Sequence, residues 1–472
     1  MRPALLSLLI LVGCAPWNQP QNQPLQRENA PLTEGGAGEG ELYIGLAFSG
    51  GGMRATAFAY GMLEELRAAG EGPAGLLDQV RLVSGVSGGS VMAAQFGLRG
   101  PEGLAGFRER FLLTDAERYM VTSGANPLTI VKGVAGGVNG RETFGRYLDE
   151  ALFQGATFAE LRTSGIKTWI NATDMANNTP FLFSPETFDA LCSDLSKVRI
   201  SEAVAASAAY PLVFTPIVLE AHQGDCDYQE PDWLTAARYN PEATAAMRAH
   251  ARALESYTNP KEVKFVKLLD GGITDNFGTT GLAVERARAE VPYAPLTAAE
   301  AVKLKRMLFL VANAGVEQDY DWTQKVAGPG GVNLAMSIAS SAMSAASRSG
   351  YDSMRGELRL WEMELIEWRC ALPLEEVRRL RGTAEGWDCK DVKLFVGEAS
   401  FASLPADLRE EVNKVPTRLK LDAAQVDAVI AAGRMAVRLT PEFNGFVASL
   451  AGNDVESRIE ASGKRRVVPL GN

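Results

Sequence analysis

The sequence predicts an α/β protein with a three-layer α/β/α core, in which helices cover both faces of a mostly parallel central sheet. Short apolar runs alternate along the chain with segments of helical pattern, and such alternation is typical of parallel sheets. The run at 306–312 is almost wholly apolar, as expected of a strand buried on both faces. Six strands are expected, at 42–48, 80–85, 167–173, 214–219, 263–269 and 306–312.

The C-terminal part has a mixed pattern and predicts an extension packed on this core. Residues 337–354 are rich in small side chains, which predicts a packed helix too polar to span a membrane. Apolar and charged residues alternate over 358–368, which predicts a half-buried antiparallel strand, with 392–396 as its partner. Apolar residues at helical spacing predict a last helix at 423–437.

The composition narrows the class of protein. A chain of 472 residues with 46% hydrophobic residues can bury a large core. Its net charge of -10 and the lack of a basic stripe exclude nucleic acid as a partner. The same acidic balance argues against general electrostatic adhesion to anionic lipids.

The N-terminus has the pattern of an export signal. A short positive start precedes the apolar run 4–12, which is too short for a spanning helix. Leu11-Val12-Gly13-Cys14 resembles a bacterial lipobox. The resemblance implies that residues 1–13 are removed and that Cys14 is lipidated, which would anchor the protein in a membrane. Ala15 follows instead of aspartate, which implies the outer membrane, on its periplasmic or surface side. An ordinary signal peptide with a chance cysteine is the alternative.

Residues 14–41 are expected to form a flexible linker, because their Pro, Gln, Asn and Gly content cannot build a core. Four cysteines remain beyond Cys14, and an even number in an exported chain predicts disulfides. Proximity in sequence favours the pairs Cys192–Cys226 and Cys370–Cys389. The chain has two histidines and no C-x-x-C pair, so no metal site is expected.

Ser87 is the strongest candidate for a catalytic residue. It lies in Gly85-Val86-Ser87-Gly88-Gly89, after an apolar strand and before a helix-like segment. A G-x-S-x-G sequence in that position is typical of a nucleophile elbow, a strained turn that exposes a serine hydroxyl. A plain Gly/Ser loop is the alternative.

Upstream, Gly50, Gly51 and Gly52 follow the first strand and precede a helix-like segment. Consecutive backbone amides at a helix N-terminus can bind an oxyanion formed in acyl transfer. The loop also fits a loose dinucleotide fingerprint. That alternative expects an acidic residue at the end of the second strand, and Asp78 precedes that strand instead.

Asp270 is the candidate base. It ends the expected strand 263–269 and is followed by two glycines. The only histidines, His222 and His250, lie in a polar stretch expected to be a surface insertion. A Ser-His-Asp triad is therefore hard to build, and Asp270 is expected to act directly on Ser87.

The order Gly-Gly-Gly-x-Arg, Gly-x-Ser-Gly-Gly and Asp-Gly-Gly resembles the patatin-like phospholipases. Two weaker blocks agree with this resemblance, at 169–174 and 206–216. The resemblance implies a Ser87–Asp270 dyad, an oxyanion hole from Gly50–Gly52, and no cofactor. It leaves Arg54 either to orient the loop or to face a substrate phosphate.

The predicted organisation is therefore a catalytic domain at 42–320, with an insertion at 221–262, and an extension at 321–472. The insertion is either a surface cap or a lid over the site. The expected function is hydrolysis of phospholipid or lysophospholipid esters by a serine acyl hydrolase. The alternatives are a catalytically idle lipoprotein that binds lipid or a partner, and a nucleotide-binding protein that uses the Gly50–Gly52 loop.

Overall fold

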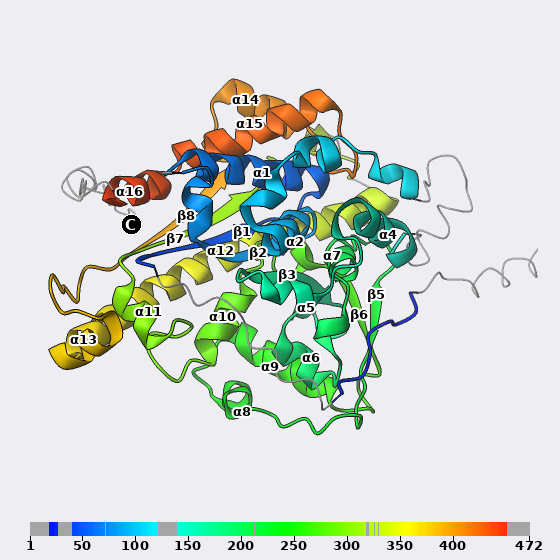
Figure 1. The fold of residues 1–472 in the computed structure, drawn as a ribbon. Helices are drawn as coiled ribbons and strands as arrows, with labels where there is room; N and C mark the ends of the chain where they lie inside the picture. Colours follow the sequence, from blue (N-terminus) through cyan, green and yellow to red (C-terminus); the bar gives the residue numbers. More distant parts are fainter. Residues whose placement is uncertain are drawn as a thin grey trace, which may run out of the picture.

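The computed structural model describes residues 18–26, 40–70, 72–120, 139–211, 213–317, 321–324, 326–328 and 330–450. Figure 1 shows a central sheet with helices on both faces, which confirms the predicted fold class. None of the helices in these ranges is both long enough and apolar enough to cross a bilayer.

One sheet of eight strands organises the molecule, in the order β5-β6-β3-β2-β1-β7-β8, with β4 paired to β3. The strands are β1 (Leu42–Phe48), β2 (Val80–Val86), β3 (Lys167–Asp174), β4 (Thr179–Leu182), β5 (Ile217–Glu220), β6 (Phe265–Asp270), β7 (Arg306–Asn313) and β8 (Lys393–Ser400). The pairs from β3 through β8 along this order are parallel, whereas β4, β5 and β6 pair antiparallel. Of these strands, β4 was not predicted, and β5 begins three residues later than expected.

The strand register brings the predicted motifs to one edge of the sheet. Phe48 at the end of β1 is opposite Gly85 of β2, so the Gly50 loop and the Ser87 turn leave neighbouring strands side by side. β6 runs antiparallel to β3 and ends with Asp270 opposite Ala172. The ends of β6 and β2 therefore lie on the two sides of the same part of β3, although the two strands run in opposite directions.

Two apolar clusters lie on the two faces of the sheet. The larger cluster packs α1, α2 and α15 against the sheet, together with most of the smaller helices. The second contains Leu82, Trp169, Met307 and residues of α12. The helices are α1 (Gly52–Ala68), α2 (Gly88–Arg99), α4 (Arg146–Leu148), α5 (Phe158–Thr163), α6 (Pro185–Ala190), α7 (Ile200–Ser207), α8 (Asp232–Tyr239), α9 (Ala245–Tyr257), α10 (Thr280–Ala287), α11 (Ala298–Lys303), α12 (Gly331–Ala371), α13 (Leu374–Arg381), α14 (Ala406–Asn413), α15 (Ala423–Leu439) and α16 (Pro441–Leu450).

The strand predicted at 358–368 is wrong, because these residues belong to the 41-residue helix α12. Leu358, Trp361 and Leu365 are buried at helical spacing, whereas Leu360 and Met363 are exposed. The two exposed apolar side chains produced the false alternation. β8 pairs parallel with β7 instead of antiparallel with 358–368. The helices predicted at 337–354 and 423–437 are confirmed within α12 and α15.

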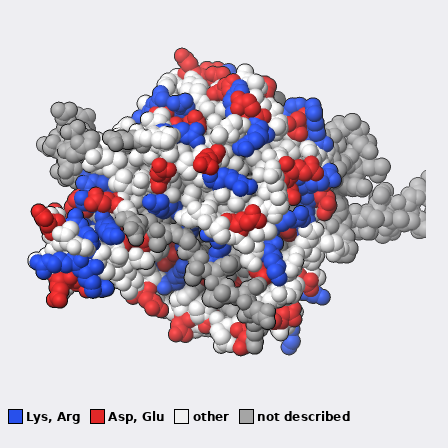
Figure 2. All heavy atoms as spheres, viewed as in Figure 1, with Lys and Arg blue, Asp and Glu red and all other residues white. Residues whose placement is uncertain are grey.

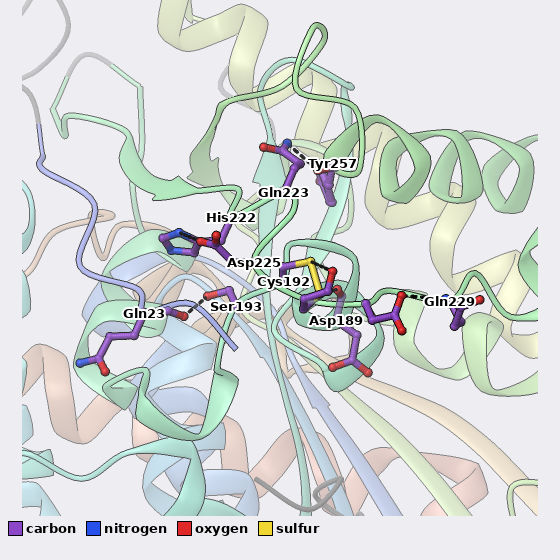
Figure 3. Close-up of a disulfide and its surroundings, with 11 residues drawn as sticks. Gln23, Asp189, Cys192, Ser193, His222, Gln223, Asp225, Gln229 and Tyr257 are labelled. Atoms are coloured by element: carbon purple, nitrogen blue, oxygen red, sulfur yellow. Dashed lines mark hydrogen bonds and ion pairs between the residues drawn. A yellow bond between two sulfur atoms is a disulfide. The ribbon is translucent and has the colours of Figure 1, made fainter. Parts of the chain in front are cut away.

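Both predicted disulfides are present, Cys192–Cys226 and Cys370–Cys389. The first fastens the beginning of the insertion 221–262 to the loop after α6 (Figure 3). The insertion forms α8 and α9, and α9 packs on β4, α6 and α10. These contacts fit the surface cap better than a lid over Ser87.

The linker predicted to be flexible at 14–41 is partly ordered, because residues 18–26 lie against the domain. We call this segment the strap. The Asn22 side chain donates to the carbonyl of Glu220 at 2.7 Å and accepts from its amide at 2.9 Å. It thus bonds to edge strand β5 much as a neighbouring strand would. The sequence did not predict this contact, because it is made by a polar asparagine side chain and not by apolar residues.

Candidate active site

Ser87 is held in a strained turn between β2 and α2. Its φ is 52° and its ψ is -123°, a conformation that costs a residue with a side chain about 1–3 kcal/mol. A Cβ on Gly88 would lie 2.0 Å from the carbonyl oxygen of Gly52, and a Cβ on Gly89 would lie 2.3 Å from that of Phe48. Only glycine fits at both places, so the turn packs directly against the Gly50–Gly52 loop. The geometry is that of the predicted elbow.

The backbone of the elbow is fixed by Ser207, a residue that sequence reasoning did not assign to the site. The Ser87 amide donates to Ser207 Oγ at 2.8 Å, and that hydroxyl donates to the carbonyl of Asn171 at 2.6 Å. Ser207 is completely buried at the end of α7. The available signal was its place in the 206–216 block.

Asp270 lies at the elbow, where the Ser87 side chain interacts with its carboxyl and lowers its pKa. Its carboxylate also accepts from the Gly272 amide at 2.9 Å. The carboxyl is buried, and burial raises its pKa to about 6, against the lowering effect of the Gly272 and Ser87 hydrogen bonds. The result is a base that is ionised at neutral pH and still basic enough to take a proton.

Neither histidine contacts this pair among the described residues. His222 Nε2 lies 3.2 Å from the carbonyl oxygen of Asn22, in the strap. His250 lies on α9 and is buried, where desolvation lowers its pKa to about 4. The expectation that both histidines lie at the surface is therefore wrong for His250, because α9 is amphipathic and His250 is on its inner side.

The glycine loop lies directly beside the serine. A Cβ on Gly50 would come within 3.2 Å of Ser87 Cβ. The Gly50 amide donates to Asn276 Oδ1 at 3.2 Å. The Met53 amide, just after the three glycines, donates to the carbonyl of Arg418 at 2.9 Å. Gly51 has φ 140°, which turns the chain so that the loop opens α1. Asn276 was missed because it follows the Asp-Gly-Gly motif outside any pattern.

Arg54 supports the loop from behind. Its Nε donates to the carbonyl of Ala314 at 3.1 Å, and its Nη1 donates to that of Val415 at 2.7 Å. The side chain is buried, and desolvation lowers the pKa of its guanidinium to about 10. Of the two roles left open by the sequence, these contacts favour loop orientation.

The N-terminal half of α12 covers the site. Met343 Cε lies 3.8 Å from the Cβ position of Gly50 and 2.6 Å from that of Gly272, so it sits between the glycine loop and the Asp270 turn. One turn on, Ser347 Oγ accepts from Asn276 Nδ2 at 3.0 Å. The expected small-residue helix is thus the cover of the site, and not only a packing element.

His, Cys, Asp and Glu form no group that could hold a metal ion within the described ranges. The groups that the site brings together are the Ser87 hydroxyl, the Asp270 carboxylate and the backbone amides of the glycine loop.

The fold and the elbow together place the chain in a known class. The model of the family "Patatin-like phospholipase" matches residues 46–283, which is half of the chain, and the chain belongs to this family. The family is one of lipid acyl hydrolases, and the match spans the glycine loop, Ser87 and Asp270. Among curated proteins, none matches the chain.

Solved structures with a similar fold share little sequence with the chain. Human GIVD cytosolic phospholipase A2 is 12% identical, with a TM-score of 0.38 over 87% of this chain and 62% of that one. VipD from Legionella pneumophila is 12% identical, with a TM-score of 0.33 over 91% and 72%. ExoU of Pseudomonas aeruginosa, in complex with SpcU, is 15% identical, with a TM-score of 0.29 over 92% and 78%. The chain thus spans less than two thirds of the human enzyme's length.

Proposed function

We propose that the protein hydrolyses ester bonds of phospholipids, lysophospholipids or related lipids through a Ser87–Asp270 dyad. The observation that carries the proposal is the position of the Ser87 side chain against the buried Asp270 carboxyl, whose pKa the serine hydroxyl lowers. It occurs at a strained elbow against a glycine loop. A serine in a surface loop would need neither the strain nor a buried carboxylate partner.

In the first half of the reaction, Asp270 accepts the Ser87 proton as Oγ attacks the ester carbonyl carbon. The carbonyl oxygen becomes an oxyanion, and the amides of Gly51 and Gly52 stabilise it, since the Gly50 amide is bonded to Asn276. Each such donor contributes about 3–4 kcal/mol to the transition state. Collapse of the tetrahedral intermediate breaks the ester bond, and protonated Asp270 gives its proton to the leaving alkoxide.

In the second half, Asp270 accepts a proton from water, and the hydroxide formed attacks the acyl-Ser87 ester. The second tetrahedral intermediate expels Ser87 Oγ, which regains its proton from Asp270, and the fatty acid leaves. The burial of Asp270 supports this role, because it raises the pKa of the carboxyl to about 6, and the group must accept and then release a proton in each half-reaction.

The substrate class rests on family membership. We propose further that the protein is an exported lipoprotein anchored through Cys14, in the outer membrane. The two disulfides support an oxidising compartment.

A fluorophosphonate probe tests the dyad directly. Wild-type protein should be labelled on Ser87, and Ser87→Ala should be neither labelled nor active. Positional analysis of the products from a defined phosphatidylcholine then gives the bond that is cleaved. A folded wild-type protein that stays unlabelled would favour the idle lipid- or partner-binding lipoprotein.

A further inference from the structure

The N-terminal half of α12 has two faces that differ in what they meet. Met343 and Ser347 lie on the face that touches the glycine loop and Asn276. Leu334 and Ile338, one turn apart on the other side, are 47% and 62% exposed. We call Leu334 and Ile338 the outer face of α12. Among the described residues, the outer face of this helix is therefore exposed and has no packing partner.

The outer face lies in a segment without charge. Residues 326–347 contain no Lys, Arg, Asp or Glu, although these make up 22% of the chain. Elsewhere, the face of the molecule in Figure 2 shows acidic and basic side chains interspersed. Exposed apolar groups in an uncharged segment fit an apolar partner and give a charged one nothing to pair with.

A third exposed apolar residue, Val213, is 41% exposed. It lies between Tyr210 and Pro216. The Tyr210 hydroxyl is 3.5 Å from the carbonyl oxygen of Met336 in α12, and the Pro216 carbonyl accepts from Asn18 Nδ2 at 2.8 Å. Tyr210 therefore contacts the beginning of α12, and Pro216 contacts the beginning of the strap.

The strap fixes where the chain before it must start. Besides the Asn22 contacts, the Leu25 amide donates to the carbonyl of Cys192, and the Asp194 amide donates to that of Gln23, both at 2.8 Å. The Gln23–Ser193 contact next to the disulfide is visible in Figure 3. Cys14 precedes Asn18 by four residues, and a chain of that length spans at most about 14 Å. Lipids on Cys14 would therefore enter a bilayer no farther than this from Asn18.

We propose that the outer face of α12 and Val213 bind the bilayer in which the lipids of Cys14 are embedded, and that the strap holds the anchor on that side. The cover of the active site would then face the lipid from which substrate comes. The inference rests on the proposed function for its substrate and on lipidation of Cys14 for its anchor. Two features commit it to a bilayer: the position of the anchor and the uncharged apolar face.

Fluorescence tests the contact without relying on hydrolysis. Ile338→Cys, labelled with bimane, is placed in phosphatidylcholine vesicles as the lipidated protein. The label is specific, because the other cysteines are lipidated or in disulfides. Brominated phosphatidylcholine should quench the probe at 338 at least threefold more than in the control Met363→Cys, which is on the distal half of the same helix and 66% exposed. Equal quenching at both positions overturns the proposal.

A second experiment connects the contact to catalysis. The rate on phosphatidylcholine vesicles is divided by the rate on a soluble short-chain ester, for Leu334→Asp/Ile338→Asp and for the matched control Leu360→Asp/Met363→Asp. The ratio should fall at least tenfold in the first variant and stay within twofold in the control. Equal ratios overturn the proposal. A wild-type protein inactive on both substrates overturns the proposed function instead, and the quenching experiment still reports on docking.

The strap is tested separately with Asn18→Ala/Asn22→Ala in the lipidated protein. The variant should still float with the vesicles, because Cys14 is unchanged, but quenching at 338 should fall at least twofold. Quenching equal to that of the unmodified strap would show that the strap does not orient the domain.

Discussion

At the scale of single residues, burial of Asp270 governs both activity and stability. Its carboxyl is 1% exposed, and burial raises its pKa to about 6, from an ordinary value of 3.8. The shift favours the protonated form in the folded protein. The folded protein is therefore less stable with Asp270 ionised, which is the active form, than with Asp270 protonated.

We expect activity on a soluble ester to depend on this pKa. Asp270 must be ionised to accept the Ser87 proton, so kcat/KM should rise about tenfold per pH unit below pH 6 and level off above pH 7. The pH profile of kcat/KM measures this, with unfolding followed across the same range as a control. A flat profile between pH 5 and 8 would contradict the assignment of Asp270 as the base.

Asp270→Asn should abolish hydrolysis and increase stability at pH 8. Because the folded pKa exceeds the unfolded one, ionisation destabilises the wild type as pH rises from about 4 to 6, by up to about 3 kcal/mol. Asparagine stays neutral and can still accept the Gly272 amide. Urea unfolding at pH 8 should therefore give the variant the larger free energy of unfolding. A less stable variant would show that the carboxylate is not destabilising.

Ser207→Ala should lower kcat without abolishing it. The change leaves the Ser87 amide without its acceptor, and a buried amide left unpaired costs about 1–3 kcal/mol. The elbow should then be less well held, so kcat falls while KM stays within about twofold. The rate of fluorophosphonate labelling should fall in parallel. A change in KM alone would contradict a role in positioning Ser87.

At the scale of elements, α1 and α15 are packed through glycines. A Cβ on Gly433 would lie 2.3 Å from the carbonyl oxygen of Phe58, and one on Gly61 would lie 2.2 Å from that of Ile430. The nearest atoms at this helix crossing belong to the backbone, so an added Cβ could not be accommodated by the movement of a flexible side chain. The loop that precedes α1 depends on this packing, because α1 begins at Gly52.

Gly433→Ala should therefore destabilise the protein by about 1–3 kcal/mol. Gly356→Ala is the matched control, since Gly356 is also helical and has no atom within 4 Å of its Cβ position. That change should stabilise by about 0.5–1 kcal/mol through helix propensity. Urea unfolding of both variants gives the comparison, and similar effects would show that the α1–α15 crossing can adapt.

The elements that were predicted from sequence are those whose pattern is set locally. The Gly50 loop, the Ser87 elbow and Asp270 each end an apolar strand, so strand signals located them. The Cys192–Cys226 pair followed from proximity. α12 was misread where Leu360 and Met363 are exposed, since their burial depends on the rest of the fold. The strap could not be found, because its side-chain and backbone hydrogen bonds go to residues about 170–200 positions away, and no local pattern marks them.

At the scale of the whole molecule, the family segment and the C-terminal extension share one sheet. β7 lies beside β1 and β8 beside β7, and both are outside the matched residues 46–283. The Cys370–Cys389 disulfide connects the end of α12 to the chain just before β8. The extension is thus part of the same folded unit.

Replacing Cys370 and Cys389 by serine should lower the free energy of unfolding by about 3–4 kcal/mol in the chain-entropy model. The bond closes a loop with a sequence separation of 19. Thermal unfolding measures the effect. As a control, Cys192 and Cys226 are replaced by serine instead, and a reducing agent should then destabilise that variant by breaking the remaining Cys370–Cys389 bond. Peptide mapping under non-reducing conditions that found four free thiols would contradict both bridges.

The hydrogen bonds that Arg418 and Val415 accept from the start of α1, here called the clamp, determine when during synthesis the site can be completed. The Met53 amide donates to the carbonyl of Arg418, and the Arg54 guanidinium donates to that of Val415. Each acceptor is synthesised more than 360 residues after its donor. A nascent chain that has already emerged as far as Asp270 carries the serine and its base, but not the clamp. Synthesis order therefore delays the finished site until almost the whole polypeptide has been made.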